Sequence, residues 1–112
     1  MVEDTLIRQT ASIVSGSFDL AVENIDVSEA MLTQVLAERI GEMLEQQPEQ
    51  LMSLLYRLDV LEEKIRPVMR PDAKDPANIG LARLVIERQK QRIFTKKNVK
   101  TEPLEGLEDW EW

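Results

Sequence analysis

The sequence contains no histidine and no cysteine, and these two absences exclude several classes of functional site. Without histidine there is no Ser-His-Asp triad and no Glu-x-x-His motif of the di-iron helical bundles. Without cysteine there is no disulfide framework, no thiolate zinc site and no cysteine nucleophile. The four glycines form no phosphate-binding loop, and the acids around Asp72 lack the spacing of an EF-hand. The sequence therefore predicts a protein that is not an enzyme and that binds no metal, cofactor or small-molecule substrate.

Aromatic residues and long apolar runs are also scarce. Only five of the 112 residues are aromatic, so a core must be built mainly from Leu, Ile, Val, Met and Ala, which suits helix packing. No stretch approaches the roughly 20 apolar residues of a membrane span, and the first residues lack the pattern of a secretory signal. We therefore expect a single small domain in the cytoplasm, with no contact with the membrane.

Charge is unevenly distributed along the chain. The net charge of −7 combines −8 over residues 1–82 (7 basic, 15 acidic), +6 over residues 83–100 (7 basic, 1 acidic) and −5 over residues 101–112 (5 acidic). A basic segment therefore separates two acidic ones. The acidic total disfavours binding to nucleic acid, whereas the basic segment by itself favours it.

Three segments outside residues 48–69 have sequence patterns typical of helices. We predict a short helix over residues 3–14, a second over residues 27–46 and a last one over residues 76–97, which has Asp75 as its cap and Pro76 at its first position. Asp26, followed three residues later by Glu29, resembles a capping box for the second helix. Ser28 is a rival cap for the same helix.

The stretch Pro48–Met69 has the densest apolar pattern of the chain. Its apolar residues recur at helical spacing: Leu51, Leu54, Leu55, Leu58, Leu61, Ile65, Val68 and Met69. One helix or two are possible, because Asp59 and Glu62 repeat the spacing of a capping box. We interpret Asp59 as the start of a second helix and expect an ion pair between Arg57 and Asp59.

Together these segments predict an all-α fold, a small bundle of four or five helices with an irregular acidic C-terminal tail. The helical domain covers residues 1–98 and the tail covers residues 99–112. We expect residues 27–46 to pack antiparallel to residues 48–69, with the last helix closing the core.

Two segments resemble a known kind of protein. Small uncharacterised helical proteins of bacteria contain segments that are similar to LLYRLDVLEEKI (residues 54–65) and LARLVIERQKQRI (residues 81–93). The resemblance implies a helical fold and a bacterial, cytoplasmic setting. It includes no catalytic signature and implies no activity, substrate or site residues.

Arg88, Arg92 and Lys96 follow one another at intervals of four, which places three like charges along one helix face. Three explanations remain open. The cations can simply be solvated near the C-terminus of a helix, whose dipole favours them. The acidic tail can fold back onto this face, within one chain or across a dimer, with Trp110 and Trp112 in an apolar groove. The basic face can also bind a nucleic acid or another polyanion, and the acidic tail then competes with that ligand for the basic face.

The function that we predict is a non-enzymatic protein–protein interaction module, with a second copy of the chain as one possible partner. The candidate contact residues are the basic face and four residues of the tail: Arg88, Arg92, Lys96, Glu105, Leu107, Trp110 and Trp112. The alternative is a small nucleic-acid-associated regulator that uses the basic helix. That alternative predicts binding that weakens steeply with salt.

Overall fold

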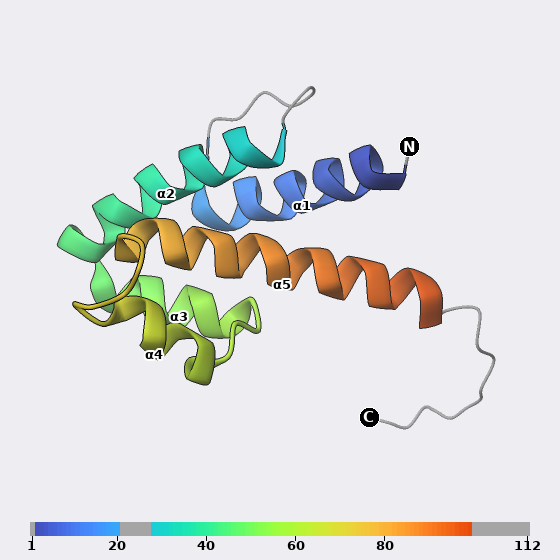
Figure 1. Cartoon of the computed structure of the whole chain (residues 1–112). Helices are drawn as coiled ribbons and strands as arrows, with labels where there is room; N and C mark the ends of the chain where they lie inside the picture. Colours follow the sequence, from blue (N-terminus) through green and yellow to red (C-terminus); the bar gives the residue numbers. More distant parts are fainter. Residues whose placement is uncertain (1, 21–27, 100–112) are drawn as a thin grey trace.

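The computed structural model describes residues 2–20 and 28–99 of the chain, and this part is helical without any strand (Figure 1). Its helices are α1 (Val2–Phe18), α2 (Glu29–Gln46), α3 (Pro48–Arg57), α4 (Glu62–Met69) and α5 (Ala77–Val99). The prediction of a small all-α bundle is therefore confirmed. The tail beyond Val99 lies outside the described residues.

The long helix α5 is the centre of the bundle. It packs against α1, α2 and α4, and Figure 1 shows it running between the pair α1 and α2 on one side and the pair α3 and α4 on the other. The reason lies in residues 79–86, where only Arg83 and Gly80 interrupt an apolar run, so that this part of the helix is apolar nearly all round. The expectation that Pro48–Met69 forms the centre and that the last helix merely closes the core was wrong in this respect.

Helix α1 is longer than the residues 3–14 that the sequence predicts. Ile7, Ala11, Val14 and Phe18 are buried and follow each other at intervals of four, three and four, which places them on one face. This continuous buried face carries the helix through Ser15 and Gly16, beyond the end of the predicted helix.

Helix α2 begins as one of the two rival caps predicts. Ser28 Oγ accepts a hydrogen bond from the backbone N–H of Met31 at 3.1 Å, so Ser28 is the N-cap. The competing cap, Asp26, lies outside the described residues. At the other end, the turn at Gln47 leads directly into α3, whose first residue is Pro48, as the sequence predicts.

The stretch Pro48–Met69 forms two helices, so the division at Asp59 is confirmed while its cause is different. Asp59 lies in the turn between the helices, and Leu61 is the residue that directly precedes α4. Asp59 is thus part of the end of α3 and does not cap α4.

The start of α5 is held close to α4. Pro76 immediately precedes the helix, and its carbonyl accepts hydrogen bonds from Ile79 and Gly80. Asp75, which was expected to cap the helix, instead pairs with Arg83 at 2.6 Å. Gly80 faces Val68 of α4 so closely that a Cβ added at Gly80 would lie 2.9 Å from that of Val68. A glycine is therefore required where the two helices meet.

Candidate functional site

The basic residues of α5 lie opposite the C-terminal end of α3. That end has the backbone pattern of a Schellman motif, in which Asp59 N donates to Tyr56 O and Val60 N donates to Leu55 O, both at 3.0 Å. Asp59 has φ 68, a left-handed conformation that glycine adopts more readily than other residues. Leu55 and Val60 are buried, so the turn is anchored in the core on both sides of Asp59.

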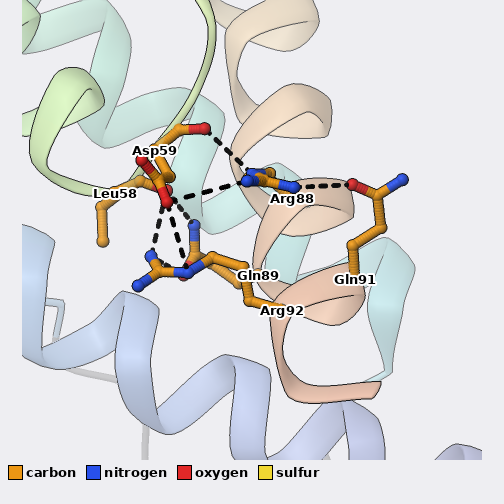
Figure 2. A network of polar contacts seen from close by, with 6 residues as sticks. All are labelled: Leu58, Asp59, Arg88, Gln89, Gln91 and Arg92. Atoms are coloured by element: carbon orange, nitrogen blue, oxygen red, sulfur yellow. Dashed lines mark hydrogen bonds and ion pairs between the residues drawn. The ribbon is translucent and has the colours of Figure 1, made fainter. Parts of the chain in front are cut away.

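Three side chains of α5 bind the carbonyl groups that this turn leaves unpaired (Figure 2). Gln89 Nε2 donates to Leu58 O at 2.8 Å, and the Arg92 guanidinium donates to the same oxygen at 3.2 Å. Arg88 Nε donates to Asp59 O at 3.0 Å. Because carbonyls at the end of a helix need partners, these contacts stabilise the turn and fix its position against α5.

The carboxylate of Asp59 adds two ion pairs to this network. Its Oδ2 lies 3.6 Å from Arg88 and 3.9 Å from Arg92, and all three side chains are partly exposed. Contacts of this length in partly hydrated surroundings contribute little, about 0.5 kcal/mol each. The expected ion pair between Arg57 and Asp59 is therefore replaced by two pairs with α5.

The predicted contact residues thus have different positions in the molecule. Arg88 and Arg92 bind the end of α3, so the explanation that they are simply solvated is wrong for these two. Lys96 belongs to α5, but its side chain is not among those described. The tail residues named above lie outside the described part of the chain: Glu105, Leu107, Trp110 and Trp112.

A groove of about 170 Å³ lies beside this network, between the start of α4 and the middle of α5. Val60, Leu61 and Leu84 form its apolar walls. Lys64 and Arg88 place positive charge on its rim, and Glu87 places one negative charge there. Arg88 therefore belongs both to the groove and to the network that positions its wall.

Leu61 is the most exposed apolar residue of this groove, with 48% of its surface accessible. The sequence pattern placed Leu61 in the apolar stripe that runs from Leu51 to Met69. The turn at residues 58–61 breaks that helical phase, so Val60 enters the core and Leu61 faces outward. Its exposure follows from the turn, which the apolar periodicity alone does not indicate.

A second, wider hollow of about 320 Å³ lies between α2 and the start of α5. Small and polar residues line it, among them Ala30, Thr33, Ala37 and Asn78. Asn78 is already occupied there, because its Nδ2 donates to Ala37 O at 3.1 Å. No residue that lines this hollow is a large apolar side chain as exposed as Leu61 is in the groove.

Residues 2–20 and 28–99, the described part of the chain, contain no group of three or more acidic residues that is placed to hold a metal ion. Within the same residues, no helix is both long enough and apolar enough to span a lipid bilayer.

Comparisons of the whole chain with protein-family models, with curated proteins and with solved structures find no match. The candidate site is therefore defined by its own geometry: an apolar groove with a cationic rim, held in place by three side chains of α5.

Proposed function

We propose that the protein is a non-enzymatic protein–protein interaction module whose main contact surface is the groove between α4 and α5. The main support for this proposal is the exposure of Leu61, whose side chain is half-exposed at the wall of an apolar groove. Covering an exposed apolar side chain with a partner lowers the free energy of the system. Grooves of this kind accept apolar side chains of a partner segment.

The rigidity of the groove wall also supports the proposal. Val60 is anchored in the core, and the carbonyls of Leu58 and Asp59 are bound by α5, so Leu61 follows a fixed turn. A surface that is already in its binding conformation loses less entropy when a partner binds. The positive rim favours a partner segment in which acidic residues flank an apolar one.

The test is quantitative affinity capture with the full chain as bait and with two variants that each add one negative charge. Leu61→Glu alters the groove. Met31→Glu is the matched control, because Met31 is equally exposed at 53% but lies on α2, outside the groove. We expect a partner that is retained by the wild type and by Met31→Glu, and whose recovery falls at least tenfold with Leu61→Glu.

Two results would contradict the proposal: no protein that binds the wild type reproducibly, or binding that both variants retain equally. Circular dichroism of the variants serves as the control for folding. Since Leu61 and Met31 are both exposed, neither substitution should unfold the protein.

The alternative function, a nucleic-acid-associated regulator, has the net charge of +6 over residues 83–100 in its favour. The intramolecular bonds of Arg88 and Arg92 count against it, because a phosphate would have to compete with the end of α3 for both side chains. A salt titration with DNA and RNA is decisive. If a chain lacking residues 101–112 does not bind at low salt, the alternative is excluded.

A further inference from the structure

We propose that the acidic part of the tail, residues 101–112, occupies the groove between α4 and α5 of its own chain, with a tryptophan against Leu61. The tail would then cover the groove in the free protein and leave it when a partner binds. This inference rests on the proposed function of the groove and names its regulator.

The size and lining of the groove fit one aromatic side chain. Its volume is about 170 Å³, and an apolar protein cavity of roughly 150 Å³ is known to accept benzene. The walls formed by Val60, Leu61 and Leu84 provide apolar contact for such a ring. An indole ring fits the open side of the groove with its N–H directed to solvent.

The charges of the rim fit the composition of the tail. Lys64 and Arg88 face the groove opening together with one acid, Glu87. Residues 101–112 contain five acidic residues, no basic residue and two tryptophans. Acids next to the tryptophans therefore meet the exposed side chain of Lys64, whereas Arg88 remains bound to the end of α3 and Glu87 adds one repulsive contact.

The tail is long enough to return to the groove. Gln91, the lining residue furthest along α5, is about 12 Å from Val99 along the helix axis at 1.5 Å per residue. The 11 residues from Lys100 to Trp110 can span up to about 36 Å when extended. Trp110 can therefore reach the whole groove, even after a reversal of the chain.

The covalent connection also lowers the affinity that docking requires. A covalent link of this length keeps the tail at an effective concentration of the order of millimolar near the groove. A tail whose intrinsic dissociation constant is about 1 mM would thus occupy the groove about half of the time. A partner with a micromolar dissociation constant can displace it.

Tryptophan fluorescence of the full chain tests this inference directly. Both tryptophans of the sequence, Trp110 and Trp112, belong to the tail, so selectively excited emission reports on the tail alone. We expect blue-shifted emission and a quenching constant for iodide at least twofold below that of the urea-unfolded chain, independent of protein concentration. Leu61→Glu should remove this protection, and Lys64→Glu should reduce it, whereas Met31→Glu should preserve it.

Three results would overturn the inference. The first is solvent-exposed emission of the wild type at every concentration, and the second is protection that survives Leu61→Glu. The third is protection that appears only as the concentration rises, because the tail would then bind a second copy. The fluorescence measurement needs no partner and the affinity capture needs no docked tail, so failure of either proposal leaves the result of the other unchanged.

Discussion

The ends of α1 and α3 share one backbone motif but are secured by different side chains. At both ends an apolar residue is followed by an aspartate with positive φ and by a second apolar residue: Phe18-Asp19-Leu20 and Leu58-Asp59-Val60. Leu20 N donates to Ser15 O at 3.0 Å, which matches the bond from Val60 to Leu55. Both ends therefore have the longer bond of a Schellman motif, with aspartate in the position that glycine usually occupies.

The partners of the two ends differ in number and burial. At the end of α1, Arg39 of α2 donates from Nε to Phe18 O at 3.1 Å. At the end of α3, three residues of α5 bind two carbonyls, and one of them, Gln89, is 99% buried. The difference indicates that the end of α3 is held more firmly, and this is the end that forms the wall of the candidate groove.

The largest effect is expected from the apolar residue that precedes each aspartate. Phe18→Ala should lower the free energy of unfolding by about 3–5 kcal/mol, and Leu58→Ala by about 2–4 kcal/mol, because both side chains are buried and leave cavities. Urea denaturation measures both values. Ile13→Ala on α1, where the side chain is partly exposed, is the control and should cost about 1 kcal/mol or less. A loss below about 1 kcal/mol for Phe18 or Leu58 would show that its helix end is not anchored in the core.

The second-largest effect should be confined to the end of α3 and should leave the end of α1 unchanged. Gln89→Leu keeps the approximate shape of the side chain but removes the buried one of the two donors to Leu58 O, together with an acceptor for Arg92, so it should cost about 1–3 kcal/mol. Hydrogen exchange should accelerate in the turn between α3 and α4 and leave the end of α1 unchanged.

Gln91→Leu is the matched control for this substitution. Gln91 is exposed on the same helix, and its side chain accepts a hydrogen bond from Arg88 at 3.2 Å. We expect a change within about 0.5 kcal/mol. Equal costs for the two glutamine variants would mean that the buried hydrogen bond does not stabilise the end of α3.

A smaller effect is expected at the end of α1. Arg39→Leu removes the donor for Phe18 O, and because Arg39 is only partly buried, water can replace part of the bond. The expected cost is about 1 kcal/mol in the free energy of unfolding. Hydrogen exchange should become faster around Asp19 and stay unchanged around Asp59. Glu42→Gln, which removes only the ion pair of Arg39 at 3.1 Å, should cost about 0.5 kcal/mol or less. Faster exchange at both ends in Arg39→Leu would show that the two ends are coupled.

The sequence predicted much of the fold, because helix caps and apolar periodicity are local. The start of α2 at Ser28 and the turn before Pro48 follow from neighbouring residues alone. The central position of α5 was not predicted, although residues 79–86 indicate it, since a helix that is apolar nearly all round requires neighbours on several sides.

The roles of Asp59 and of the basic residues were not readable in the same way. An apolar-Asp-Val pattern fits a helix start as well as a helix end, and only the burial of Val60 distinguishes the two. The partners of Arg88, Gln89 and Arg92 lie about 30 residues earlier in the chain, as their separations of 29, 31 and 34 show. Such pairing depends on how the helices pack, so a run of cations in the sequence does not reveal it.

The smallest effect concerns the two aspartates. Asparagine tolerates the left-handed conformation about as well as aspartate does, so Asp→Asn isolates the loss of the charge. Asp59→Asn should cost about 0.5–1 kcal/mol, because Asp59 pairs with Arg88 and Arg92 at long range and in partly exposed surroundings. Asp19→Asn should change the free energy of unfolding by less than about 0.3 kcal/mol, because the Arg39 bond at this end goes to the Phe18 carbonyl.

Salt provides the discriminating measurement for this pair. Raising the salt concentration to about 1 M shortens the screening length to about 3 Å, so the cost of Asp59→Asn should fall towards that of Asp19→Asn. Urea denaturation at low and high salt measures this convergence. A cost that persists at high salt would mean that Asp59 acts through the geometry of its hydrogen-bonded turn. The two ends would then differ in the buried donor, Gln89, and not in their charges.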